Sequence, residues 1–166
     1  MSEDNAGAGT VRRDGNGSEA RLVRHFDHPR WAVWNLLTDA AGIARWLAPG
    51  TIEPEEGGRV HIDFADSGLV IDSRLTTFAP PARLAYSWSS GDEPARPLLW
   101  ELEEQDGGTR LALTVTLPPG EDIAKAAAGF DAHLEMLAAA LEGVPIKFPF
   151  ETYLLARRAY VEKLDA

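Results

Sequence analysis

The sequence of 166 residues contains no cysteine, and this absence excludes several kinds of chemistry at once. Disulfide bonds, thiolate nucleophiles and cysteine-based metal sites are all ruled out. Basic residues are also scarce, because 16 lysines and arginines stand against 26 aspartates and glutamates, giving a formal net charge of −10. A chain of this sign repels phosphate backbones and anionic lipid headgroups. We therefore expect neither nucleic acid nor a membrane surface as a partner.

Long apolar runs are missing as well. No run approaches the roughly 18 residues that a membrane-spanning helix needs. The start, MSEDNAGAGTVRRDGNGSE, holds no apolar segment of the kind found in signal peptides. These absences predict a soluble, cytoplasmic protein. Apolar residues still make up 45% of the chain, which is enough to build the core of one domain.

The N-terminal part of the chain predicts a hairpin followed by two short helices. Residues 1–9 are small and polar, and we expect them to be disordered. Short runs on either side of DGNG, within residues 10–27, predict the hairpin. Pro29 stands where a first helix opens, and Pro49-Gly50 ends a second one.

After these helices the apolar period changes from 3.6 to 2 residues, which indicates strands. The alternating runs are RVHIDFA, GLVIDSRLTTF, LAYSWS, PLLWELEE and TRLALTVTL. Tight turns join them, so we expect an antiparallel meander with one covered face and one wet face. The alternation places on the covered face Tyr86, Trp88, Trp100, Leu113 and Val115.

A long helix is predicted between Pro118-Pro119-Gly120 and Gly143, and the run FETYLLARRAYVEKL predicts a second amphipathic helix. One helix is only about 10 Å across, whereas six or seven strands span roughly 30 Å. A curved sheet that wraps round the long helix would leave a gap beneath it. A mid-helix glycine, Gly129, costs about 1 kcal/mol relative to alanine. Such a gap, a close contact or simple tolerance at the surface would each explain it.

Several runs together resemble the helix-grip superfamily, which embraces steroidogenic-acute-regulatory lipid-transfer domains, the birch-pollen allergen and polyketide cyclases. They are RLVRHFDHPRWAVWNLLTDAAGIARWLAPG, EEGGRVHIDF, APPARLAYSW, GGTRLALTVTL and AAGFDAHLEMLAAALEG. Within the superfamily they are most similar to the branch named after the activator of the ninety-kilodalton heat-shock protein ATPase. The resemblance implies an α+β helix-grip fold, in which a curved antiparallel sheet of six to seven strands wraps round a long C-terminal helix. It also implies two short helices after the first strand.

The resemblance divides the chain into a helix-grip domain over residues 10–143 and a C-terminal extension over residues 144–166. We expect the amphipathic helix of the extension to pack on or beside the domain. The family commonly holds an apolar or amphipathic small molecule between sheet and helix. We predict that this cavity is lined by Trp46, Phe64, Tyr86, Trp88, Trp100, Phe130 and Leu134. The Tyr86 hydroxyl and the indole N–H groups would orient the ligand. For these aromatic residues a role in the plain core stays open.

No catalytic residue, cofactor site or metal site is identified. The four histidines lack the paired spacing of metal ligands. His133 stands apart only because its position would edge the cavity below Phe130. DGNGSE lacks the lysine of a phosphate-binding loop. We therefore expect no cofactor.

Three functions remain open. The leading hypothesis is the binding of an apolar or aromatic small molecule in the cavity. The second is a cyclase-like or dehydratase-like enzyme that uses the same cavity. The question of enzymatic activity leans towards no, because no acid/base pair can be named. The third is a chaperone-related protein-interaction module, with a homodimer or protein partner held through the C-terminal helix.

Overall fold

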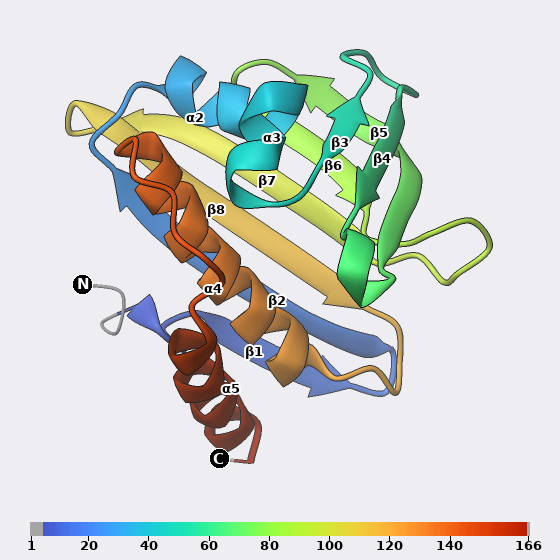
Figure 1. The fold of residues 1–166 in the computed structure, drawn as a ribbon. Helices are drawn as coiled ribbons and strands as arrows, with labels where there is room; N and C mark the ends of the chain where they lie inside the picture. Colours follow the sequence, from blue (N-terminus) through green and yellow to red (C-terminus); the bar gives the residue numbers. More distant parts are fainter. Residues whose placement is uncertain (1–4, 166) are drawn as a thin grey trace.

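The computed structural model describes residues 5–165, which form one antiparallel sheet of eight strands with helices against its concave face (Figure 1). The strands lie in the order β1-β2-β8-β7-β6-β5-β4-β3. Their bounds are β1 (Thr10–Asp14), β2 (Gly17–Phe26), β3 (Gly50–Ile52), β4 (Arg59–Asp63), β5 (Val70–Ala79), β6 (Arg83–Ser87), β7 (Pro97–Gln105) and β8 (Gly108–Leu117). The helices are α2 (Arg30–Thr38), α3 (Ala40–Trp46), α4 (Ile123–Leu141) and α5 (Phe150–Asp165), with a 3₁₀ turn, η1, at Ala65–Ser67.

Two details differ from the expected fold. The sheet has eight strands rather than six or seven, because β3 adds a three-residue strand that pairs with β4. Three residues are too few to show an alternating pattern. The two short helices follow the second strand, because the N-terminal hairpin supplies both β1 and β2.

The pairing of the strands confirms the predicted covered face. Trp100 on β7 stands opposite Leu84 on one side and Leu113 on the other. Tyr86 pairs with Leu98, which itself pairs with Val115. All of these side chains are buried. A one-residue slip would turn each of them to solvent, so burial of this face determines the register.

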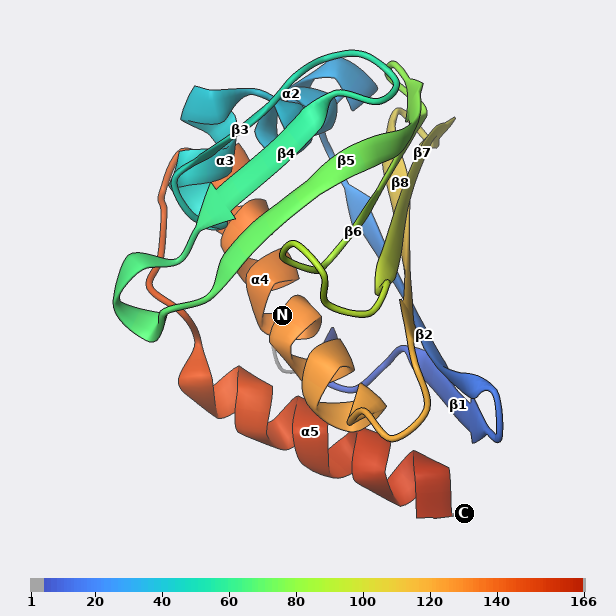
Figure 2. The ribbon, with the colours of Figure 1, turned by 90° about the vertical axis from the view of Figure 1, so that its right-hand side faces the viewer.

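The sheet bends round α4, which runs between the β4–β5 part and the β2–β8 part (Figure 2). A register shift between Leu75 and Thr77 on β5 marks the bend, since bulges increase the local twist. Helix α4 is capped at both ends. The Asp122 carboxylate accepts a backbone N–H of the first turn, and Gly143 ends the helix with φ of 78°.

Helix α5 packs against α4 through a buried polar cluster centred on Asp131, whose side chain is fully buried. One carboxylate oxygen accepts from the Arg24 guanidinium at 2.7 Å. The other accepts from the Tyr160 hydroxyl at 2.5 Å and from the Gly7 N–H at 3.0 Å. A buried charge is tolerated only when it is paired and hydrogen-bonded, so this cluster fastens α5 to the domain.

The same cluster holds residues 5–9. The Gly9 N–H donates to the Tyr160 hydroxyl, and the Lys163 ammonium donates to the carbonyls of Gly7 and Gly9. We therefore place residues 5–9 with the folded domain. Residues 1–4, the remainder of the segment expected to be disordered, lie outside the described residues. Within residues 5–165, none of the helices combines the length and the apolar character that crossing a membrane requires.

Candidate functional site

A pocket of about 640 Å³ lies between the N-terminal half of α4 and the sheet. This volume falls within the roughly 300–1,000 Å³ that small-molecule sites occupy. Its walls come from the η1 region, from the end of β6 and the loop that follows it, from β8, from α4, and from the first turn of α5 with the linker before it. The apolar and aromatic lining residues are Phe64, Leu69, Trp88, Val115, Leu117, Ala126, Gly129, Phe130, Phe148 and Tyr153.

Three aromatic rings form one wall of the pocket. Trp88 lies between Phe130, at a ring-centroid distance of 5.2 Å, and Phe64, at 5.7 Å. Both pairs are edge-to-face, with interplanar angles of 68° and 63°. Such contacts hold the rings in place and still leave apolar surface towards the pocket.

Gly129 forms the α4 side of the pocket. A Cβ atom built at this position would meet no other side chain or strand atom within 4 Å. The open space excludes a close contact as the reason for this glycine, and because Gly129 lines the pocket, that space is part of the pocket. The missing side chain leaves room between the helix and the aromatic wall.

His133 lies one turn after Gly129 and also lines the pocket. Three aromatic rings surround the imidazole: Phe148, Phe64 and Trp46 at centroid distances of 5.4, 6.0 and 6.5 Å. Its Nδ1 lies 3.0 Å from the Gly129 carbonyl oxygen. Burial lowers the pKa of His133, while the backbone hydrogen bond acts in the opposite direction. The ring is therefore uncharged at neutral pH.

The rim of the pocket carries charges that are mostly paired. Arg96 makes a bidentate contact with Glu121, at 2.7 and 3.0 Å, and a further contact with Glu93 at 3.2 Å. The hydrogen bonds to Glu121 are the main reason that the pKa of Arg96 is raised. Lys125 and Asp122 complete the charged rim. The pocket thus combines an apolar interior with a polar edge, which suits an apolar or amphipathic molecule.

The family model described as "Activator of Hsp90 ATPase homolog 1-like protein" matches residues 27–142. The chain belongs to this family. With the sheet wrapped round α4, the match confirms the helix-grip superfamily. No curated protein matches the chain.

Solved structures of similar proteins extend the comparison. CalU16 from Micromonospora echinospora is 20% identical with a TM-score of 0.78, covering 95% of this chain and 98% of its own. The BPP1335 protein from Bordetella parapertussis is 30% identical with a TM-score of 0.67, covering 92% of each chain. DynU16, described as a putative protein in the dynemicin biosynthetic locus, is 27% identical with a TM-score of 0.69. That match covers 76% of this chain but only 48% of DynU16.

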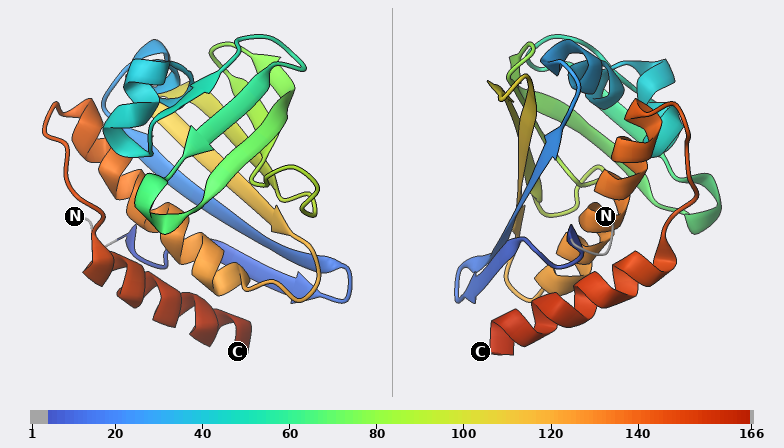
Figure 3. Two further views of the ribbon diagram at one scale, coloured as in Figure 1. Left: turned by 45° about the vertical axis from the view of Figure 1, so that its right-hand side comes forward. Right: turned by 90° about the vertical axis from the view of Figure 1, so that its left-hand side faces the viewer.

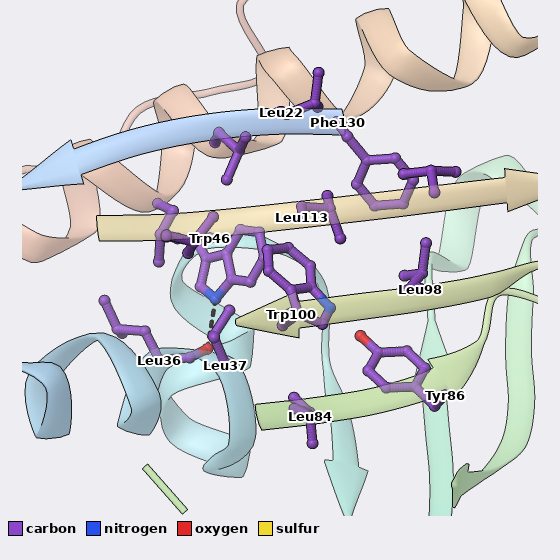
Figure 4. Packing of buried hydrophobic residues seen from close by; sticks show 14 of the residues in the cluster. Leu22, Leu36, Leu37, Trp46, Leu84, Tyr86, Leu98, Trp100, Leu113 and Phe130 are labelled. Atoms are coloured by element: carbon purple, nitrogen blue, oxygen red, sulfur yellow. Dashed lines mark hydrogen bonds between the residues drawn. The ribbon is translucent and has the colours of Figure 1, made fainter. Parts of the chain in front are cut away.

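Three of the seven residues predicted to line the family's cavity lie in the pocket: Phe64, Trp88 and Phe130. The other four, Trp46, Tyr86, Trp100 and Leu134, are buried in the core outside it. Figure 4 shows Trp46 beside Trp100, with ring centroids 6.0 Å apart and nearly perpendicular planes. The Trp46 indole N–H donates to the Leu36 carbonyl. The space that was expected to be a cavity at this end is filled by α2 and α3.

Tyr86 and Trp100 carry polar groups that are buried in this part of the core. In Figure 4 the Tyr86 hydroxyl and the Trp100 indole nitrogen point towards each other. Within residues 5–165 the Trp100 Nε1 atom is buried and has no hydrogen-bond partner. Burial raises the pKa of Tyr86, so its phenol stays neutral. Both polar groups lie in the core and not on the pocket wall, where we expected them.

Phe148 and Tyr153, by contrast, were missed as pocket residues. Both lie in the extension, beyond residue 142 where the family match ends. The linker runs back alongside α4 and brings Phe148 against His133 (Figure 3). The dense aromatic run FPFETY was the signal available in the sequence. Among residues 5–165, no group of three or more His, Asp or Glu side chains is placed to hold a metal ion.

Proposed function

We propose that this chain binds an apolar or aromatic small molecule in the pocket between the sheet and the N-terminal half of α4. The observation that carries the proposal is the open volume of about 640 Å³ bounded by aromatic rings. Enclosure by apolar walls supplies affinity, and a few polar groups set orientation. Phe64, Trp88 and Phe130 would contact the molecule. Trp46, Tyr86, Trp100 and Leu134 would support those walls from the core.

The charged rim supports an amphipathic ligand. Arg96, Glu93 and Glu121 lie at the edge of the pocket, whereas the interior is aromatic and aliphatic. A molecule whose polar end meets this rim would keep that end hydrated and bury the remainder. The similarity to DynU16, from a biosynthetic locus, agrees with a small-molecule role.

A pocket-filling variant tests the proposal. Nile red, a neutral dye whose fluorescence rises in apolar surroundings, is titrated into the parent protein, Gly129→Ala and Gly129→Leu. The alanine adds one methyl group to open space and should leave binding nearly unchanged. The leucine extends into the pocket and should weaken binding at least tenfold. Equal binding by all three proteins would contradict the proposed site, and native mass spectrometry would identify any molecule that co-purifies.

A cyclase-like or dehydratase-like reaction in the same pocket is the second candidate function. The observation in its favour is His133, an uncharged imidazole in an apolar pocket, which is the type of group that moves protons near neutral pH. The test is to incubate the protein with a molecule that it retains and to record that molecule's mass. Loss of water would favour the enzyme, and an unchanged mass would favour binding alone.

An interaction module is favoured by a different surface. Phe150, Leu154, Leu155 and Val161 on α5 are exposed large apolar side chains. The buried side consists of Thr152, Ala156 and Tyr160. A homodimer through this exposed face would bury these side chains. Sedimentation of the parent protein and of Leu154→Glu would test it, since a dimer of the parent should become a monomer.

A further inference from the structure

Among the described residues, His133 is the histidine that lines the pocket. It lies one helical turn beyond Gly129, at the place where the helix leaves open space. Rings of Phe148 and Phe64 pack against the imidazole from the linker and from the end of β4. The ring is thus held in one position by its neighbours, while the pocket lies beside it.

The hydrogen bond of Nδ1 determines which nitrogen carries the proton. The Gly129 carbonyl oxygen, 3.0 Å from Nδ1, can only accept a hydrogen bond. Nδ1 therefore donates, and in the neutral ring Nε2 is left with a free lone pair. The pKa of His133 is lowered by burial, which keeps the ring in this neutral form. Within residues 5–165, no protein donor forms a hydrogen bond to Nε2.

We propose that Nε2 of His133 is the polar anchor of the pocket and accepts a hydrogen bond from a hydroxyl group on the bound ring system. This inference rests on the proposed function and adds the chemical class of the ligand, an apolar molecule that carries a phenol or an alcohol. A ketone, an ether or an ionised carboxylate has no proton to donate to a bare imidazole nitrogen.

The charges at the rim support the same class. Arg96 is already engaged by Glu121 and Glu93, so it offers little free positive charge to an anionic ligand. Lys125, the other cation of the rim, is exposed to solvent, where salt screens its attraction to an anion. An ammonium group would have to lose its water against the aromatic rings, which is costly without a charged partner. A neutral hydroxyl group needs neither a free cation nor a charged partner in the pocket.

Two probes that differ in one donor test the anchor. 2-Naphthol and 2-methoxynaphthalene share a ring system, but only the first can donate a hydrogen bond. Isothermal titration calorimetry at pH 7.5 should show that the parent protein binds 2-naphthol about three- to tenfold more tightly, the usual net worth of one hydrogen bond. His133→Phe keeps an aromatic ring and removes the acceptor, so the preference should disappear. His61→Phe removes an imidazole outside the pocket and should keep the preference.

The outcomes separate this inference from the proposed function. If the parent protein binds both probes equally, the anchor is overturned while the pocket stands. If it binds neither probe, the proposed function fails and the anchor fails with it. If His133→Phe weakens both probes alike, the ¹⁵N spectrum of the parent protein decides. A shift of the His133 Nε2 resonance with 2-naphthol alone supports the anchor, and an unchanged resonance overturns it.

Discussion

The two ends of the space between α4 and the sheet are built from similar residues and differ in what covers them. At the C-terminal end of α4, helices α2 and α3 fill the space, and Trp46 and Trp100 pack edge to face. At the N-terminal end, Trp88 and Phe130 meet in the same manner, yet a pocket of about 640 Å³ remains beside them. Aromatic residues on a covered face therefore become core or pocket wall according to the element that lies above them.

The largest expected effect is a difference in stability between tryptophan variants at the two ends. Trp100→Ala should lower the free energy of unfolding by about 3–5 kcal/mol, because it empties a packed site. Trp88→Ala should cost less, about 1–2 kcal/mol, since part of its ring already faces the pocket. Urea unfolding measures both values. Equal losses would show that the Trp88 end is as fully packed as the other.

The next effect concerns the outer wall of the pocket, which α5 and its linker supply. Asp131→Asn should destabilise the protein by about 3–5 kcal/mol, because the buried Arg24 loses its charged partner. Nile red affinity should fall as well, since α5 carries Tyr153 to the pocket. The exposed pair of Arg59 and Asp72 offers a control, and Asp72→Asn should change stability very little. If Asp131→Asn is equally mild, the cluster does not fasten α5.

A smaller and opposite effect is expected at Gly129. Gly129→Ala should stabilise the protein by about 1 kcal/mol, because alanine favours the helix and its methyl group enters open space. Gly143→Ala is the control of opposite sign, since that glycine adopts a left-handed φ of 78°. Thermal unfolding compares the two variants. A loss of stability in Gly129→Ala would mean that the space beside the helix is occupied.

The smallest expected effect is a dependence of stability on pH. Burial lowers the pKa of His133 in the folded protein, so the unfolded chain binds a proton more readily. The contribution of the neutral ring is present above a pH of about 6.5, the ordinary pKa of histidine, and is lost as the pH falls below it. The midpoint of urea unfolding should therefore drop less between pH 7.5 and pH 5.5 in His133→Phe than in the parent protein. An equal drop in the two proteins would show that the His133 imidazole is exposed to water in the folded state.

The sequence predicted correctly which side chains lie on the covered face of the sheet. It did not predict which of them are buried in the core and which line the pocket. Alternation put Tyr86, Trp100 and Leu113 on one covered face, and the pairing of β6, β7 and β8 confirms it. Alternation carries no information about which non-local element lies above a residue, so it could not separate Trp88 from Trp100. The apolar period also failed to predict the short strand β3 and the contribution of the irregular linker that carries Phe148.

The buried carboxylate of Asp131 has a consequence for the order in which the chain is made. Its partners come from residues 7, 24 and 160, so the cluster joins segments that leave the ribosome at well-separated times. Domains emerge N-terminal end first during synthesis. Until Tyr160 has emerged, one oxygen of Asp131 lacks its hydroxyl partner and the wall that holds Tyr153 cannot dock. The pocket is therefore completed after translation has passed the last turns of α5, and a ligand present earlier would meet a site open on one side.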